Sequence, residues 1–310
     1  MTGLIGLALL ASVFFGLSDF LGGTLSRKLP MLTVLFLSQI VAVISLTPQA
    51  IIDPFDFSAT SSIIWGLVAG FAAAIAVSSL FKALAIGTMG VIAPITSLSV
   101  LVPVTVGIIM GDQLTIVLAL GLAAAVVGTV LASGPEIKRK VPSAGGTQAI
   151  VLGGIAALAF GVANLAIALG SATSVTTTLL TDAVTVLVMY TGGLIIFKQV
   201  PKARGLSLLG IVAIGVLGFA ANISFAFASL SGALSIVAVL ASLYPVVTAI
   251  LGWRFHNERL MRVQLWGVAL VLAGVATIAA TSSRFLNEMP VKLVGSANPT
   301  SSRWVGKVTQ

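Results

Sequence analysis

Ten long apolar stretches follow one another along the chain, separated by short segments rich in Gly, Pro and charged residues. Each stretch has about the 20 residues that an α-helix needs to cross a bilayer core of roughly 30 Å. The pattern therefore predicts an all-α integral membrane fold with ten transmembrane helices, at about 4–24, 31–51, 62–83, 90–110, 114–132, 149–169, 176–197, 206–227, 233–253 and 262–281.

An internal repeat divides these ten stretches into two sets of five. The segment from Phe15 to Asp19 aligns with the segment from Phe160 to Asn164, about 145 residues later. Five further pairs follow in the same order: Gly66 with Gly210, Phe81 with Phe225, Gly90 with Gly232, Pro103 with Pro245, and Asp112 with Glu258. The offset drifts by about one helical turn, and its jump after Pro103 implies that four residues are missing from the first half.

The repeat sets the expected organisation of the chain. We expect a first five-helix repeat over 1–132, a polar linker over 133–148, a second five-helix repeat over 149–281 and a disordered tail over 282–310. Because five is odd, the second repeat enters the membrane from the opposite side, which gives inverted repeats. Secondary transporters commonly have this architecture, with a substrate site near the midplane where the repeats meet.

Composition narrows the picture mainly by exclusion. The chain is 58% hydrophobic and 8% charged, with a mean hydropathy of +1.17, so a multi-pass protein of the cell membrane is expected, with the lipid bilayer as its solvent. A net charge of +8 would suggest nucleic acid in a soluble protein, but here Lys and Arg lie between apolar stretches and set orientation, so no nucleic-acid partner is expected. There is no Cys, and neither a metal site nor a cofactor is predicted; the oligomeric state stays open.

Three blocks of sequence resemble the EamA-like permeases of the drug/metabolite transporter superfamily: Gly16 to Gly23, Phe81 to Pro94, and Tyr244 to Leu260. The resemblance covers roughly 4–281, although Asn257 stands where such permeases usually have glycine. The superfamily is similar across amino-acid exporters, metabolite exporters and multidrug pumps, so the resemblance implies transport without naming a substrate. It also implies cytoplasmic termini, whereas the basic residues crowd the odd-numbered loops and the positive-inside rule would place both termini outside.

Ionisable side chains within the apolar stretches are candidates for function, because each costs about 2.5 to 3.5 kcal/mol to insert. Asp19 shares a helix face with small residues, which predicts an interior position; alternatively, it reaches the headgroups or pairs with Arg27. Lys82 shares a polar stripe with Ser78, and the second repeat has Asn222 in the matching region. The alternative for Lys82 is that its long stem carries the charge to the membrane surface.

Asp182 is the third such residue, and Gln39 occupies approximately the matching place in the first repeat. Asp182 is predicted to bind a substrate amine or a coupling proton, or else to be a structural partner of a nearby hydroxyl or Lys. The complete set of predicted substrate-binding or proton-binding residues is Asp19, Gln39, Lys82, Asn164, Asp182, Asn222 and Tyr244.

These features favour a secondary transporter that exports or exchanges amino acids or related small metabolites. No nucleotide-binding loop is present, so coupling must come from an ion gradient or from the solute itself. The expected partner is a small-molecule solute, with proton coupling as an option. The alternative is efflux of multidrug or cationic compounds, with a carboxylate and aromatic rings for contact. A third possibility from another class is an intramembrane aspartyl protease using Asp19 and Asp182, but the motifs typical of such proteases are missing, and we do not expect an enzyme.

Overall fold

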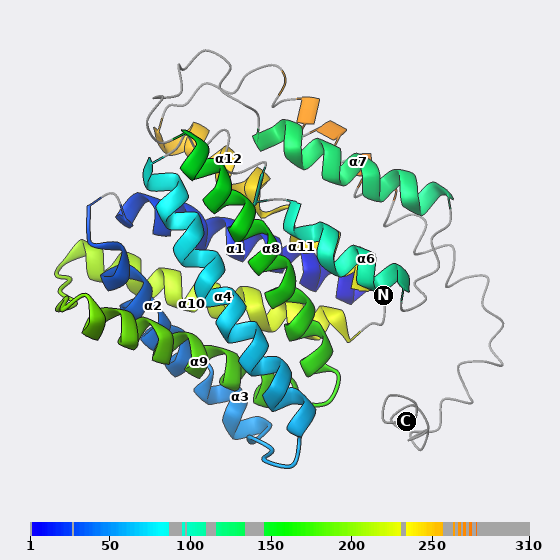
Figure 1. Cartoon of the computed structure of the whole chain (residues 1–310). Helices are drawn as coiled ribbons and strands as arrows, with labels where there is room; N and C mark the ends of the chain where they lie inside the picture. The colour runs from blue at the N-terminus through cyan, green and yellow to red at the C-terminus, as the bar shows by residue number, and fades with distance from the viewer. Residues whose placement is uncertain are drawn as a thin grey trace.

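A computed structural model describes residues 2–26, 28–86, 95–96, 98–109, 116–133, 146–230 and 234–256, with a few positions between 263 and 277. The described residues form helices and no strand (Figure 1). The helices are α1 (Thr2–Ser26), α2 (Met31–Ser45), α3 (Thr47–Ile52), α4 (Thr60–Ile86), the 3-10 turn η1 (Leu98–Val100), α6 (Leu101–Ile109), α7 (Ile116–Ser133), α8 (Gly146–Ser171), α9 (Val175–Ile196), α10 (Leu206–Ser229), α11 (Leu234–Ala241) and α12 (Tyr244–His256).

Six stretches of described helix are long and apolar enough to cross a membrane, and they match the predicted spans one, two, three, six, seven and eight. The predicted fourth and ninth spans are each divided into shorter pieces, η1 with α6 and α11 with α12. The predicted tenth span lies largely outside the described residues, as do most of the linker and the whole of the tail. The described part of the chain therefore confirms an all-α membrane fold but not the full count of ten helices.

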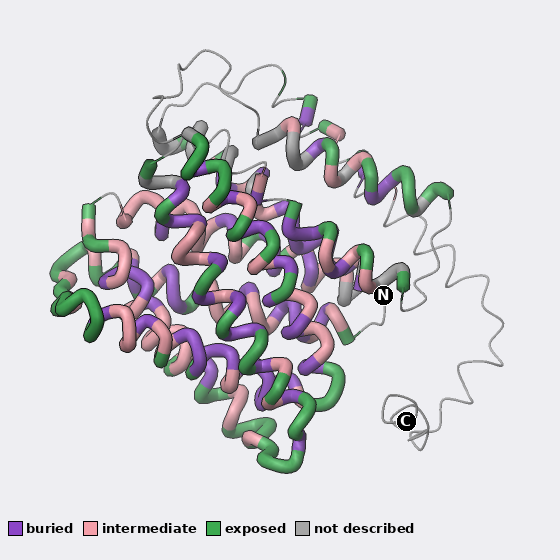
Figure 2. Tube along the Cα trace, viewed as in Figure 1, coloured by how far each residue is buried: buried purple, intermediate pink, exposed green. Residues whose placement is uncertain are grey.

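The helices carry large apolar side chains outward and small ones inward. On α4, for example, Ile64, Phe71 and Ile75 are exposed, whereas Ala69 and Ala76 are completely buried. Figure 2 shows the same alternation of exposed and buried positions along the other helices. Since lipid tails are as apolar as leucine, large side chains gain nothing by leaving them, and small interior residues let the helices approach closely.

The contacts between helices are reciprocal. If α1, α2, α4 and α6 are taken as the counterparts of α8, α9, α10 and α11, each major pairing across the repeats recurs after exchange. Thus α1 packs on α10 as α8 packs on α4, and α2 packs on α10 as α9 packs on α4, while α2 with α9 and α6 with α11 pair with their own counterparts. This reciprocity is what a twofold relation between the two repeats produces.

Two glycines show the reciprocity at the level of atoms. A methyl group on Gly70 would lie 2.5 Å from the Thr185 Cβ and 2.7 Å from the Asp182 carbonyl oxygen. A methyl group on Gly215 would collide in the same way with the carbonyl oxygen of Ser38. Gly70 and Gly215 are 145 positions apart, and Ser38 and Asp182 are 144 apart, so the two close approaches are counterparts.

Gln39 lies where the two repeats meet. Its side-chain nitrogen donates a hydrogen bond to the Ala183 carbonyl oxygen at 3.0 Å, and these residues are themselves 144 positions apart. Gln39 therefore contacts its own counterpart, Ala183. A residue can do so only close to the axis that relates the two repeats. The approximate match of Gln39 with Asp182 therefore shifts by one residue, because Ser38 is the counterpart of Asp182.

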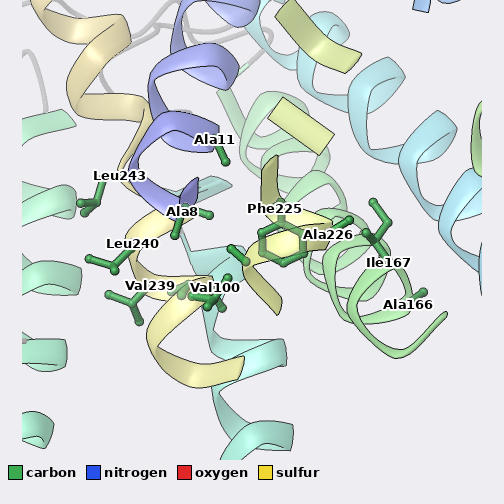
Figure 3. Close-up of a cluster of buried hydrophobic side chains, with 14 of the residues drawn as sticks. Ala8, Ala11, Val100, Ala166, Ile167, Phe225, Ala226, Val239, Leu240 and Leu243 are labelled. Atoms are coloured by element: carbon green, nitrogen blue, oxygen red, sulfur yellow. The ribbon is translucent and has the colours of Figure 1, made fainter. Parts of the chain in front are cut away.

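A cluster of buried apolar side chains joins both repeats (Figure 3). Phe225, which is 1% exposed, is the largest of its fully buried members. The others labelled in the figure come from α1, η1, α8, α10, α11 and the residues after α11: Ala8, Ala11, Val100, Ala166, Ile167, Ala226, Val239, Leu240 and Leu243. This cluster fixes α1 and α8 against the divided fourth and ninth spans.

Polar contacts tie the two repeats together at one end of α9. The Thr176 hydroxyl donates to an Asp53 carboxylate oxygen at 2.7 Å and accepts from the Gln49 side-chain nitrogen at 3.2 Å. Next to it, the Asp56 backbone nitrogen donates to the Thr177 hydroxyl at 3.0 Å. The segment from α3 to α4 in the first repeat is therefore held at the beginning of α9 in the second.

Candidate functional site

The ninth span is interrupted at two residues, Ser242 and Leu243, which separate α11 from α12. Pro245 explains the interruption, because it has no N–H to donate to the Ala241 carbonyl and so cannot continue the hydrogen bonds of α11. The interruption of the fourth span is a departure from regular α-helix, in which the 3-10 turn η1 leads directly into α6. Such discontinuous helices place backbone groups and helix ends inside a membrane protein, where they can bind solutes.

Each interruption packs against a glycine of the first helix of the other repeat. A methyl group on Gly16 of α1 would lie 2.6 Å from the Val247 Cβ and 2.8 Å from the Tyr244 carbonyl oxygen. A methyl group on Gly161 of α8 would lie 2.7 Å from the Ser99 carbonyl oxygen. Gly16 and Gly161 are 145 positions apart, as are Ser99 and Tyr244, so the two interruptions are counterparts.

This packing corrects one part of the repeat alignment. The predicted match of Pro103 with Pro245 is out by three residues, because Val100 occupies the place of Pro245. The offset thus stays near 145 through the fourth span, and no loss of four residues from the first half is needed. The alignment paired the two prolines because they are the same residue type, although their positions within the two repeats differ by three residues.

Asp19 and Tyr244 come together at the interruption of the ninth span. Asp19 lies one turn beyond Gly16 on α1, is half-buried, and is close enough to Tyr244 to interact with it electrostatically. The buried Tyr244 hydroxyl lies beside the side chains of Thr96 and Ser99 in the first repeat, without a hydrogen bond of good geometry. A carboxyl group, a phenol and two hydroxyls therefore converge from α1, α12 and the interrupted fourth span.

Two contacts hold Tyr244 in place. The Phe15 ring meets the Tyr244 ring edge to face, with the centroids 6.3 Å apart. The Thr248 hydroxyl is shared between the carbonyl oxygens of Gly16 and Tyr244, at 3.2 and 3.1 Å. These contacts fix the beginning of α12 against α1, so the position of the phenol is set by both helices.

Asn164 occupies the equivalent place in the second repeat. It is half-buried on α8, one turn beyond Gly161, and α8 packs against η1 and α6. The two half-sites therefore differ in chemistry: Asp19 offers a carboxyl group, whereas Asn164 offers an amide that can both donate and accept hydrogen bonds.

Asp182 belongs to a second group of polar residues. It is 4% exposed on the face of α9 that packs against α4, and its Oδ1 atom has no hydrogen-bond partner. Tyr190 lies close enough to interact with it electrostatically, and the Tyr190 hydroxyl lies beside the Ser78 side chain of α4. The structure therefore groups Asp182 with Tyr190, and Asp19 with Tyr244.

Within the described part of the chain, no contact with either group is observed for the remaining predicted residues, apart from the Gln39 hydrogen bond to the residue after Asp182. Lys82 has an exposed side chain close to the end of α4, Asn222 is half-buried on α10, and Gln39 is engaged with the α9 backbone. Thr96 and Ser99 were not predicted, since hydroxyls are common in membrane helices. A constant repeat offset of 145 would have indicated Ser99 as the counterpart of Tyr244.

Comparison with known families decides the identity of the fold. The sequence model of the EamA-like transporter family matches the chain twice, over residues 2–134 and 147–280. The chain belongs to this family. This EamA-like transporter is accordingly a membrane protein with two family repeats, as predicted, and family membership implies transport of small solutes.

A solved structure with low sequence identity has a similar fold. A protein whose crystal structure carries no functional description superposes on the transporter with a TM-score of 0.72 at 14% sequence identity, over 92% of this chain and 99% of the other. At that identity the likeness concerns the fold alone. Among curated proteins, none matches this chain.

Proposed function

We propose that this EamA-like transporter exports or exchanges amino acids or related small metabolites by alternating access. The observation that carries the proposal is the convergence of Asp19, Tyr244, Thr96 and Ser99 where the interrupted fourth and ninth spans meet. The interrupted spans contact each other directly, as α6 and α11, so the group lies at the junction of the two repeats. Secondary transporters place their substrate sites at such junctions.

The direction of the helices is compatible with ten spans in inverted repeats, as it is with any arrangement that has an even number of crossings between α4 and α9. Along α4, Gly66 approaches the Thr178 carbonyl oxygen, and one turn later Gly70 approaches that of Asp182. The two helices therefore run parallel, which requires an even number of membrane crossings from one to the other. Four crossings satisfy this condition if the interrupted fourth span and α7 both cross the membrane.

The donor and acceptor chemistry favours an amino acid. The carboxylate of Asp19 suits an ammonium group, whereas the Asn164 amide, the hydroxyls and the positive end of the α12 dipole suit a carboxylate. A site with both kinds of group is complementary to a zwitterion. The Phe15 and Tyr244 rings beside Asp19 instead favour the alternative, efflux of cationic compounds. A protease gains no support, because Asp19 and Asp182 lie in separate groups, each with its own tyrosine.

Counterflow into proteoliposomes tests the proposal. Vesicles are loaded with unlabelled solute, and uptake of the labelled solute is followed for neutral, acidic and basic amino acids and for tetraphenylphosphonium. We expect saturable uptake of at least one amino acid, and no uptake of tetraphenylphosphonium beyond that of protein-free vesicles. Uptake of the cation alone would select the alternative function. Absence of any uptake by protein that elutes as a single folded species would refute transport of these solutes.

A further inference from the structure

We propose that Asp182 is a proton-binding site, separate from the substrate site, and that its protonated form keeps the contact between α4 and α9 closed. The coupling of this site to transport rests on the proposed function, whereas the proton site itself does not. Two independent observations carry the proposal: the Oδ1 atom is buried without a partner, and the Asp182 backbone lies at one of the close contacts between the two repeats.

The threonine hydroxyls next to Asp182 on α9 are not free to stabilise a charge on it. The Thr178 hydroxyl donates its proton to the Ser174 carbonyl oxygen at 2.8 Å, and the Thr181 hydroxyl donates to that of Thr177 at 2.7 Å. A hydroxyl has one proton to give, so neither can donate to the carboxyl group as well. An ionised Asp182 would thus receive no hydrogen bond from either threonine, and the neutral acid is the form that fits this conformation.

No counter-ion reaches Asp182 from the helices that pack on α9. Within their described lengths, α2, α8 and α10 have no titratable side chain, and α4 has only Lys82. Lys82 is exposed and lies twelve residues beyond Gly70, which is about 18 Å along the helix. On α9 itself, Tyr190 is the only titratable neighbour, and Asp53 accepts from Thr176 about 9 Å before Asp182.

The tight packing converts proton binding into a conformational effect. Gly70 leaves no space beside the Asp182 backbone and the residue is only 4% exposed, so full hydration of the carboxyl group requires that α4 and α9 separate. Loss of the proton would demand that hydration, so deprotonation favours an open contact and protonation favours the closed one. The contact joins helices of different repeats, which are the parts that move in alternating access.

Two measurements test the proton site without any transported solute. The first is infrared spectroscopy of the membrane-reconstituted protein at neutral pH, in which a protonated carboxyl group has a carbonyl band that ionised carboxylates lack. We expect Asp182→Asn to reduce this band and Asp182→Glu to shift it, while Asp53→Asn, at an acid outside the helices, leaves it unchanged. An Asp182→Asn band equal to that of the unaltered protein would overturn the proposal.

The second measurement reports the contact between α4 and α9. Thr181→Cys introduces the only cysteine in the chain, at a half-buried position whose Cβ lies against Gly66. Its rate of modification by a maleimide is divided by the rate in the Thr181→Cys/Asp182→Asn protein at the same pH, which removes the intrinsic pH dependence of the thiol. We expect this ratio to rise at least fivefold with increasing pH. A ratio that does not change with pH would refute the proposed switch, and it would do so whether or not counterflow is observed.

Discussion

Replacing Gly70 with alanine is expected to lower the free energy of unfolding by about 3 kcal/mol. The added methyl group would lie 2.5 Å from the Thr185 Cβ and 2.7 Å from a backbone oxygen of α9. Backbone cannot move aside as a flexible side chain can, so α4 and α9 must separate along their length. For a chain of this size, the midpoint of thermal unfolding in detergent should fall by about 5 °C.

Gly154→Ala is the matched control for this change. Gly154 also lies within a long membrane helix, α8, but nothing lies within 4 Å of a methyl group added there. Its replacement should be neutral or should stabilise the helix by up to about 1 kcal/mol, because alanine has the higher helix propensity. Equal effects of the two substitutions would show that close packing of α4 on α9 does not support the fold.

Asp19→Asn is expected to reduce the initial rate of counterflow at least about 30-fold while leaving the protein folded. The amide keeps the shape of the side chain but loses the negative charge beside Tyr244. Removing one member of a charged pair with a bound ammonium costs about 2 kcal/mol or more, which corresponds to that factor. The rates are measured with a solute that the unaltered protein exchanges.

Ser18→Ala provides a control one residue away. The Ser18 hydroxyl donates to the Ile214 carbonyl oxygen at 3.3 Å, so it serves the contact between α1 and α10 rather than the candidate site. We expect counterflow within about twofold of the unaltered rate, since a long hydrogen bond of this kind contributes about 1 kcal/mol or less to stability. Wild-type rates in Asp19→Asn would remove Asp19 from the site.

The sequence was sufficient to predict most long helices and, from prolines such as Pro245, that the fourth and ninth spans kink or break, but not the packing that accompanies these interruptions. An uninterrupted apolar run has one stable solution in lipid, a hydrogen-bonded helix, so α1, α4, α8, α9 and α10 follow from hydrophobicity. The apolar run of the ninth span continues through Ser242 and Leu243 without change of composition. Its interruption depends on Pro245 and on packing against α1, and only the first of these is visible in the sequence.

For the candidate site, the sequence identified residues but not their partners. Asp19, Asn164 and Tyr244 stand out because polar groups are costly in lipid, yet nothing local shows that Asp19 meets Tyr244, more than 200 positions away. Thr96 could not be distinguished from the many hydroxyls that bond to their own helix. These residues come together because helices from the two repeats pack against each other, as α1 does on α12 and α6 on α11.

The central claim is that the group at the helix interruptions is a substrate site that opens to each side of the membrane in turn. The direct test uses Ser99→Cys, the sole cysteine in such a protein, with membrane-impermeant thiol reagents applied to either side of oriented vesicles. Ser99 is 2% exposed, so modification reports opening, and Thr60→Cys at the exposed start of α4 is the control. We predict modification of Ser99→Cys from both sides, slowed by the exchanged solute, whereas Thr60→Cys is modified from one side only and is insensitive to solute. Modification of Ser99→Cys from a single side, or from both sides without protection by solute, would contradict the account.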